Sequence, residues 1–328
     1  MKIYLTFDYE LFFGQQTGTV KKCMIEPTNY LLEIARGKAQ MTFFVDVGYL
    51  IALEKWKEKF PQLSEDLRAV KQQITQILEE KHSVQLHIHP HWENVKFENG
   101  AWNINVDGCY KLSDFTLEES ADIVRKYKYY LDELLGYSTT VFRAGGWCIQ
   151  PFDRLQAVFE ELKLEIDSSV MPGMKYFTEH YSYDFSAVRS SDPYTFSSDI
   201  CEEDVHGKMT EYPIATMQYS PIFYWFLYGW GRLIPSKHKV VGNGTAVAQP
   251  GRKWEVLTRR TLHHVSADGY FALKLPLATR KFAREGKQHL VIIGHPKSLT
   301  QFSSKKLKNY IAKYSSTHQF ISLNNANR

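Results

Sequence analysis

Seven short runs rich in β-forming residues recur along the 328-residue chain, and helix-like stretches separate them. Strands that alternate with helices form parallel sheets, because each right-handed crossover returns the chain to the same end of the sheet. Seven such units predict an α/β fold that closes, or nearly closes, into a barrel. The strand-like runs cover residues 2–9, 41–50, 83–89, 139–147, 164–170, 210–218 and 289–296.

Three of the intervening stretches carry the signals of helices. One begins with Thr116, has Glu119 three positions later and ends at Gly136, which is a capping box followed by a glycine stop. The others show apolar side chains at helical spacing or a proline in the first turn. The predicted helices cover residues 64–81, 116–137 and 151–162.

The composition limits the classes of protein to which the chain can belong. At 44% hydrophobic it can bury a large core, and we expect one domain over 1–328 with loop insertions at about 172–209 and 219–288. The net charge of +4 is mild and no basic block is present, which argues against a nucleic-acid partner. The four cysteines form no CxxC pair, so a thiolate zinc site is not expected.

No stretch of the sequence has the pattern of a signal peptide or a membrane span. The first residues already form a strand-like run, and the default expectation is therefore a cytoplasmic protein. The longest apolar stretch, 220–233, is too short to cross a bilayer. We expect it to be a buried or partly buried insertion, with a membrane-surface or acceptor-binding patch as the alternative.

Three histidines on alternate residues, His87, His89 and His91, lie at the end of the third strand-like run. Alternate residues of an extended strand point to one side, so a strand through this segment would crowd three imidazoles into a small volume. Bound metal is the usual reason for such crowding. Asp8 and Glu10 are also two residues apart at a strand end, and carboxylates with histidines match a hydrolytic zinc-type site.

Other polar residues follow the same rule of position. Asp8, His87, Arg143, Asp167 and His295 all fall at the carboxyl ends of strand-like runs. Barrels built from such units place their sites at that rim. The chemistry-bearing residues therefore occur where the expected fold would position a functional site.

Six motifs, TFDYE, MTFFV, LHIHPHW, FRAGGW, DSSV and IIGHP, follow one another from residue 3 to about residue 299. In this order they resemble the motif series of polysaccharide deacetylases, that is, carbohydrate esterase family 4 and its relatives. The resemblance implies a distorted (β/α)7 TIM-like barrel and a single divalent metal. It also implies that metal-activated water removes an acyl group from an N-acylated sugar.

The resemblance implies roles for the residues of the first two motifs, although the first motif differs from that of the family. The first motif of the family is TFDD, in which one Asp is the general base and the other a metal ligand; here Tyr9 replaces the second. Either Asp8 is the base and Glu10 the ligand, which we prefer, or the roles are reversed. His87 and His91 match the two metal histidines of the second motif, and His89 is an alternative to His91.

The later motifs imply the remaining roles. Arg143 would hold the base ionised, and Trp147 would form a wall of the sugar pocket. Glycine replaces the usual proline two residues after the arginine, so that Gly145 and Gly146 would let the backbone approach the ligand closely. His295 matches the general acid that protonates the leaving amine. Asp167 would either orient His295 or pair with Arg143.

These assignments predict a zinc-type deacetylase that acts on a carbohydrate substrate in polysaccharide or glycan biosynthesis. Histidine-rich ligation favours zinc, and cobalt, nickel and iron fit similar ligand sets. Two alternatives follow from the departure at Tyr9. One is a hydrolase of a non-sugar, cyclic amide on the same fold, and the other is a sugar-binding relative without catalysis.

Overall fold

The computed structural model describes residues 1–178, 180–246 and 252–326. The chain forms two compact units, which are described separately. The first unit comprises Met1–Met41 and Ile214–Ile321, and the second comprises Thr42–Pro213 with the C-terminal residues from Ser322. The single domain expected over 1–328 stays a prediction.

The first unit is built on β1 (Lys2–Tyr9), which pairs in parallel with β14 (His289–Gly294) and β15 (Gln319–Phe320). The register with β14 runs from Lys2 opposite His289 to Phe7 opposite Gly294. Every residue of β1 after Lys2 is buried, as expected for a parallel strand covered on both faces. The two strands predicted at 2–9 and 289–296 are confirmed.

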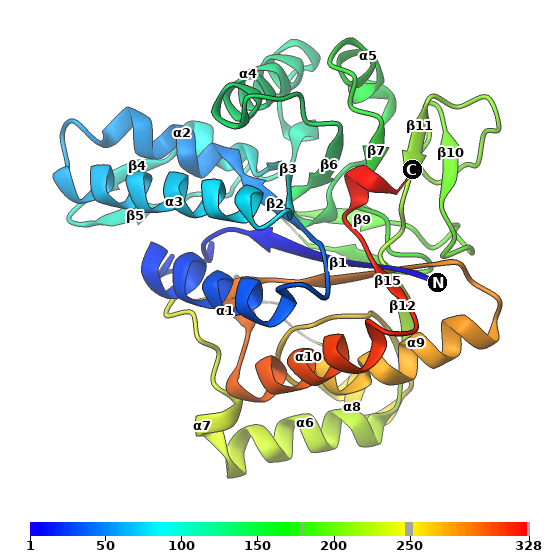
Figure 1. Ribbon diagram of the computed structural model, residues 1–328. Helices are drawn as coiled ribbons and strands as arrows, with labels where there is room; N and C mark the ends of the chain where they lie inside the picture. The colour runs from blue at the N-terminus through cyan, green and yellow to red at the C-terminus, as the bar shows by residue number, and fades with distance from the viewer. Residues whose placement is uncertain (179, 247–251, 327–328) are drawn as a thin grey trace. The chain divides into compact units, whose positions relative to one another are not determined.

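Helices and a small two-stranded antiparallel sheet complete the first unit (Figure 1). The stretch expected to be loops at 219–288 contains several helices, because its apolar residues recur at helical spacing as well as in clusters. The helices and remaining strands of the first unit, inside and outside that stretch, are α1 (Glu26–Ala35), β12 (Thr216–Tyr219), α6 (Pro221–Leu233), α7 (Pro235–His238), α8 (Lys253–Thr258), β13 (Thr261–His264), α9 (Leu275–Arg284) and α10 (Gln301–Tyr314). No helix among the described residues has both the length and the apolar character needed to cross a membrane.

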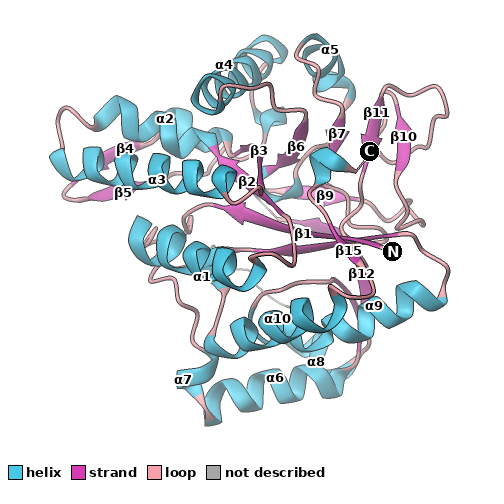
Figure 2. Cartoon of the chain, viewed as in Figure 1, coloured by secondary structure: helices cyan, strands magenta, loops and turns pink. Residues whose placement is uncertain are grey.

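The second unit contains a mainly parallel sheet, drawn as magenta arrows in Figure 2. From one side to the other it runs β2 (Met41–Asp46), β3 (Ser83–Ile88), β6 (Val141–Ala144), β7 (Ile166–Asp167), β11 (Met209–Glu211) and the antiparallel β10 (Tyr194–Phe196). The strand predicted at 41–50 is too long, because a helix, α2 (Val47–Trp56), begins at Val47. The run at 210–218 is two strands, β11 and β12, in different sheets.

The three predicted helices are present in the second unit. In α4 (Leu117–Leu135), Thr116 Oγ1 accepts from the Glu119 amide at 3.2 Å, and Gly136 stops the helix with φ of 72°. The unit's other helices and short strands are α2 (Val47–Trp56), α3 (Pro61–Glu79), α5 (Asp153–Glu161), β4 (Lys96–Glu98), β5 (Ala101–Asn103), β8 (Lys175–Phe177) and β9 (Ser182–Asp184). The insertion expected at 172–209 therefore contains short hairpin strands rather than loops alone.

Candidate active site

In the first unit, two carboxylates and a histidine meet at the carboxyl ends of β1 and β14. Asp8 and Glu10 are 3% and 5% exposed. Because the two strands are parallel and in register, His295 emerges at the same edge as Asp8. Its Nε2 lies 3.6 Å from Asp8 Oδ2 and 4.0 Å from Glu10 Oε1. The sequence placed all three residues at this edge, and the unit brings them together.

Asp268 fixes the orientation of His295. Its Oδ2 accepts from His295 Nδ1 at 2.7 Å, and its Oδ1 accepts from the His295 backbone amide at 2.8 Å. The Asp268 backbone amide is in turn bound to Ser266 Oγ at 3.0 Å. The residue that orients His295 through Nδ1 is thus Asp268, which corrects this alternative for Asp167. Asp268 belongs to none of the six motifs, and no sequence signal pointed to it.

The charges around His295 favour its protonated form. Burial alone lowers the pKa of His295, but the carboxylates of Asp268, Asp8 and Glu10 outweigh burial and raise the pKa above the ordinary histidine value. Nδ1 donates to Asp268, so Nε2 is the ring nitrogen that faces the other two carboxylates. A proton at Nε2 is therefore aimed at the same small volume as the Asp8 side chain.

Lys297 is a second residue that the sequence analysis missed. Its Nζ donates to Glu10 Oε1 at 2.7 Å and also to the carbonyl oxygen of Leu11. The rings of Phe12 and Phe13 flank the ammonium, with centroids 4.8 and 4.9 Å away. This buried ion pair holds the Glu10 carboxylate in one position. Lys297 lies two residues after His295, which was the only hint in the sequence.

In the second unit, the three histidines cluster, although the strand ends before it reaches the last of them. β3 ends at Ile88, because Pro90 starts a 3₁₀ turn over Pro90–Asn94. The ring centroids of His87 and His89 are 4.8 Å apart, and those of His89 and His91 are 5.3 Å apart. All three are at most 2% exposed. The expected crowding is present: extended backbone brings His87 and His89 together, and the turn adds His91.

The tautomer of His87 is fixed by the backbone. β3 pairs with β6 so that His87 lies opposite Arg143, and His87 Nδ1 is 2.8 Å from the Arg143 carbonyl oxygen. A carbonyl can only accept, so Nδ1 donates and carries the hydrogen. In the neutral ring, Nε2 then carries the lone pair. Metal-ligating histidines are commonly prepared in this way.

Arg143 is fully buried, and its side chain is held from several sides. Its Nε donates to the Ser168 carbonyl at 2.7 Å, and Nη2 donates to Ser168 Oγ at 3.0 Å. The guanidinium carbon lies 4.2 Å from the centroid of the Phe44 ring. Within the second unit, this network holds the arginine in one rotamer.

Asp167 shares its surroundings with a second buried carboxyl group, that of Glu211, which the sequence analysis did not single out. Asp167 accepts from the backbone amide and the hydroxyl of Ser169 at 2.8 and 2.9 Å. Burial raises the pKa of Glu211 well above its ordinary value, and the charge of Asp167 raises it further. Burial also raises the pKa of Asp167, while the charge of Arg143 opposes that shift. The charge of Arg143 thus acts on Asp167, and pairing with Arg143, the other role expected for Asp167, stays a prediction.

The glycines after Arg143 make room for protein groups. A Cβ on Gly145 would lie 2.5 Å from His89 Nδ1, and one on Gly146 would lie 2.6 Å from the Tyr110 ring. Gly146 also has φ of 58°. The backbone at Gly145 and Gly146 was expected to approach a ligand closely. In the structure it lies close to His89 and Tyr110.

Aromatic rings surround the histidine cluster in the second unit. Tyr110 stacks on His91 with centroids 6.0 Å apart, and it also contacts Tyr181 at 5.2 Å. Trp147, the expected pocket wall, lies edge-on to Tyr183 at 6.1 Å. Flat rings of this kind suit the apolar faces of sugars.

The candidate ligands are distributed over both units. Glu10 belongs to the first unit, and His87, His89 and His91 belong to the second. Glu10, His87 and His89 are buried, and each offers one atom of a type that binds divalent metals. The donor chemistry therefore fits a metal ion.

Comparisons with solved structures show the fold. A proposed polysaccharide deacetylase from Mycobacterium smegmatis matches 99% of this chain and 88% of its own, with a TM-score of 0.52 and 14% identity. A GH57 branching enzyme from Thermococcus kodakaraensis matches 98% of this chain and 70% of its own, with a TM-score of 0.50 and 8% identity. The chain has the α/β fold of the deacetylases, a distorted TIM-like barrel, as predicted.

The remaining comparisons add no closer relationship. The peptidoglycan deacetylase PdaC from Bacillus subtilis matches 98% of this chain and 87% of its own, but its TM-score of 0.35 and 11% identity carry no argument. No model of a protein family matches the sequence. No curated protein matches it either. The likeness is one of fold, and that fold is shared by carbohydrate deacetylases and branching enzymes.

Proposed function

We propose that the protein is a metal-dependent hydrolase that removes an N-acyl group, most simply acetyl, from a sugar during polysaccharide or glycan biosynthesis. The observation that carries the proposal is the arrangement of His295. Asp268 holds its Nδ1, and its Nε2 faces the carboxylates of Asp8 and Glu10. A histidine and a carboxylate in this relation can deliver and accept protons at one reacting bond.

The reaction needs two proton transfers. Asp8 accepts a proton from the water whose oxygen attacks the amide carbonyl carbon. His295 then donates its Nε2 proton to the nitrogen as the carbon–nitrogen bond breaks, and a carboxylic acid and an amine leave. Asp268 keeps the imidazole aimed throughout, because it holds the opposite nitrogen and the backbone amide. A positioned acid–base pair contributes about 10²–10⁴-fold to the rate.

The metal ligands proposed are Glu10, His87 and His91, with His89 as the alternative to His91. A divalent ion, when bound, lowers the pKa of water and polarises the carbonyl oxygen. His87 supports this role because its Nδ1 donates to the Arg143 carbonyl, so that in the neutral ring the lone pair is on Nε2, the atom that would bind the ion. Zinc suits the imidazole-rich set. Arg143 and Trp147 keep the roles that the resemblance implies, and the cytoplasmic setting remains an expectation.

The test is incubation of the purified, zinc-loaded protein with N-acetylated sugars and oligosaccharides, with acetate and free amine measured in parallel. We expect equal amounts of both products. His295→Gln should lose at least about 100-fold of that rate, because the proton donor is gone. Glu10→Ala should lose zinc, whereas Asp8→Asn should keep zinc and lose turnover.

The rival functions give different products. New reducing ends without acetate would replace the proposal by glycoside cleavage, the chemistry suggested by the fold shared with a branching enzyme. Turnover of a cyclic amide but of no sugar would favour the non-sugar hydrolase. Zinc and sugar binding without any turnover would favour the non-catalytic relative. Reversed behaviour of Asp8→Asn and Glu10→Ala would exchange the roles of base and ligand.

A further inference from the structure

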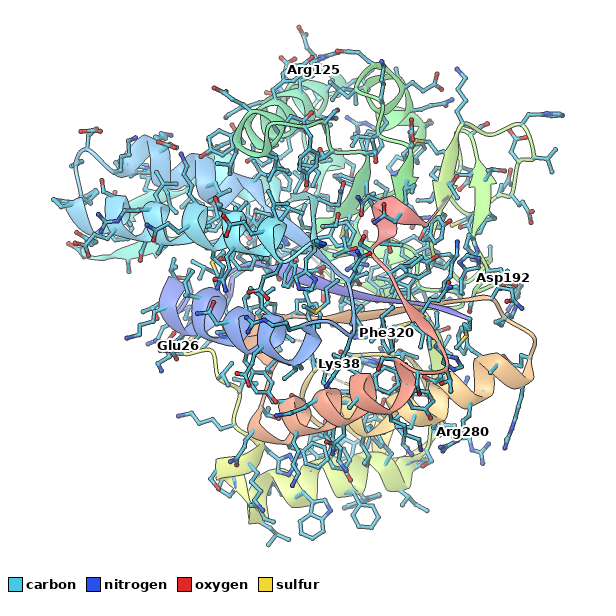
Figure 3. The ribbon with its side chains drawn as sticks, viewed as in Figure 1. Glu26, Lys38, Arg125, Asp192, Arg280 and Phe320 are labelled. Carbon is cyan, nitrogen blue, oxygen red and sulfur yellow. The ribbon has the colours of Figure 1, made fainter. Side chains whose placement is uncertain are left out.

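The first unit carries a helix whose outer side is apolar and exposed. In α6 the exposed residues Ile222, Trp225, Phe226, Trp230 and Leu233 are between 39% and 75% exposed. Their positions repeat at steps of three and four, so they form one stripe along the helix. Figure 3 shows ring-bearing side chains projecting from the outer side of α6. We call this stripe the α6 surface.

The α6 surface is not the solvent-facing side of an ordinary amphipathic helix. The inner side of α6 is also apolar, since Phe223 and Tyr224 are buried in the unit. A helix that packs one apolar side normally turns a polar side to water. Trp254 of the neighbouring helix α8 is 75% exposed. Trp225 of α6 donates from its Nε1 to the carbonyl of Leu257, which also belongs to α8, at 3.1 Å. The apolar surface therefore extends from α6 to α8 and is held in place by a hydrogen bond.

Basic residues are frequent in the segment of chain that carries this surface. Residues 220–264 contain seven lysines and arginines and one acid, Glu255, although the whole chain has a net charge of only +4. The rest of the chain is therefore slightly acidic. Most of the seven are exposed: they are Arg232, Lys237, Lys239, Arg252, Lys253, Arg259 and Arg260. Exposed tryptophans among basic side chains are the composition found at membrane–water interfaces.

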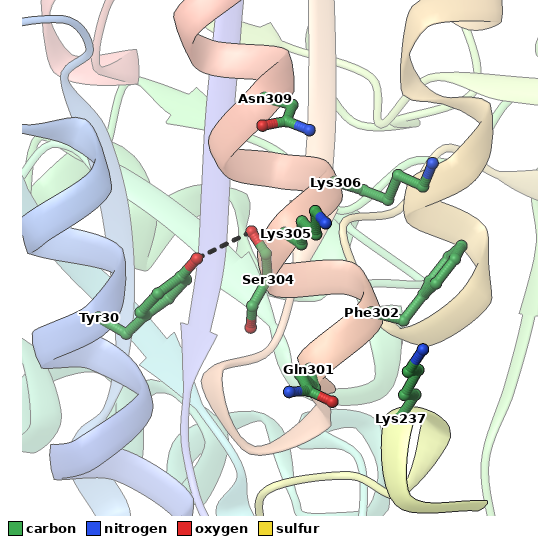
Figure 4. A pocket seen from close by; sticks show the side chains of 8 residues that line it. All are labelled: Tyr30, Lys237, Gln301, Phe302, Ser304, Lys305, Lys306 and Asn309. Atoms are coloured by element: carbon green, nitrogen blue, oxygen red, sulfur yellow. Dashed lines mark hydrogen bonds between the residues drawn. The ribbon is translucent and has the colours of Figure 1, made fainter. Parts of the chain in front are cut away.

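A cavity lined by lysines lies beside the helix that follows α6. α7, which follows α6, and α10 border a cavity of about 570 Å³ (Figure 4). Lys237, Lys305 and Lys306 line it with Tyr30 and Asn309, and none of the described lining residues is acidic. Three ammonium groups and the Asn309 amide suit a phosphate group, while the Tyr30 hydroxyl donates to the Ser304 carbonyl.

We infer that the α6 surface binds an anionic membrane surface, with the lysine-lined cavity receiving a lipid phosphate. α6 has 13 residues and is about 20 Å long, so it is too short to span a bilayer and would lie in its plane. The same charges disfavour a second copy of the chain as the partner, because two such surfaces would repel each other. The inference is independent of the proposed reaction.

The first experiment mixes the full-length protein with vesicles and separates bound protein by flotation. Neutral vesicles contain phosphatidylcholine alone, and anionic vesicles also contain phosphatidylglycerol. We expect binding to the anionic vesicles only, weakened at high salt because the attraction is screened. Absence of binding, or equal binding to both kinds of vesicle, would overturn the inference.

The apolar contribution is tested by the triple variant Ile222→Ser, Phe226→Ser and Leu233→Ser. All three side chains are exposed, so the unit should keep its fold. Binding to anionic vesicles should fall about tenfold or more, because three large side chains no longer leave water. Unchanged binding by the folded variant would count against the α6 surface.

A matched control removes exposed apolar side chains elsewhere in the chain. Leu117→Ser, Phe177→Ser and Val205→Ser change residues of the second unit that are 58%, 65% and 78% exposed. This variant should float like the wild type. An equal loss in both triple variants would show nonspecific adhesion and would contradict the inference.

Two further measurements avoid reliance on variants that could misfold. Lipids brominated on their acyl chains should quench the tryptophan fluorescence of the wild type, since Trp225 and Trp230 lie on the α6 surface. Lack of quenching would refute insertion. Inorganic phosphate at millimolar concentration should leave flotation nearly unchanged; complete release would assign the cavity to free phosphate and overturn its role in lipid binding.

Discussion

The pairing of Asp268 with His295 decides which nitrogen of the imidazole can deliver a proton. Asp268 accepts from both the ring and the backbone amide of His295, so the ring can neither flip nor exchange its hydrogen-bonded nitrogen without losing this half-buried partner. Asp268 touches the acid rather than the reacting atoms, and it is therefore a positioning residue. Its effect should appear in turnover rather than in substrate or metal binding.

Asp268→Asn should lower kcat by roughly 100-fold or more, because the amide no longer carries the charge that holds the donor form of His295. KM and zinc content should stay near the wild-type values. Steady-state kinetics of acetate release and metal analysis measure the three quantities. Asp122→Asn, at an exposed helix position, is the control and should behave like the wild type. A parallel loss of zinc would show that Asp268 acts on the metal ligands instead.

Glu211 should make the protein less stable as the pH rises. Its pKa is raised well above the ordinary 4.5 by burial and by Asp167, so the folded state holds the proton more tightly than the unfolded chain does. The free energy of unfolding therefore falls as the pH rises from about 4.5 through the raised value. Glu211→Gln should flatten this fall, as measured by urea unfolding at several pH values. Glu118→Gln, on the surface of α4, should retain the wild-type slope.

At the scale of elements, local chemistry predicted some boundaries and tertiary structure set others. The ends of α4 follow from Thr116, Glu119 and Gly136, because capping groups lie within a few residues of the backbone they satisfy. The end of β3 was placed one residue too late, since the strand stops at Ile88 just ahead of Pro90. Asp268 was missed because it reaches His295 across 27 residues, a separation that no periodicity encodes.

Gly145 connects β6 to the histidine cluster, and it leaves no room for a side chain. In Gly145→Ala the added methyl would meet His89 Nδ1 at 2.5 Å and the Ile88 carbonyl at 2.6 Å. The free energy of unfolding should therefore fall by about 1–3 kcal/mol. Gly231→Ala in α6 is the control: no atom lies within 4 Å, and the helix should gain up to about 1 kcal/mol. Equal effects of the two changes would argue against crowding at His89.

For the whole molecule, the sequence predicted the fold class better than it predicted the site. The order of strand-like runs and motifs is a property of the entire chain, and it led to the α/β barrel that the comparison with a deacetylase structure bears out. Lys297 and Glu211 were missed because they act through strands that neighbour in the sheet but lie far apart in the chain. Such partners emerge only once the strands are assembled.

If one zinc ion takes Glu10 and His87 as ligands, its binding should stabilise the chain as a whole. At a free zinc concentration of 100 times Kd, the free energy of unfolding should rise by about 2.7 kcal/mol. Thermal unfolding with and without chelator measures this gain. Both Glu10→Ala and His87→Ala should abolish it, whereas His206→Ala, at an exposed position, should not. If zinc does not change the melting temperature of the wild type, Glu10 and His87 do not bind one common ion.

The hydrogen bond from His87 ends on the main chain of Arg143 rather than on its side chain. A carbonyl oxygen is present whatever amino acid occupies position 143. The arginine can therefore mutate while the imidazole keeps the hydrogen on the same nitrogen, provided that the two strands stay aligned. A substitution at position 143 can thus remove the guanidinium without changing which nitrogen of His87 carries the hydrogen. During evolution, the two features could therefore change independently.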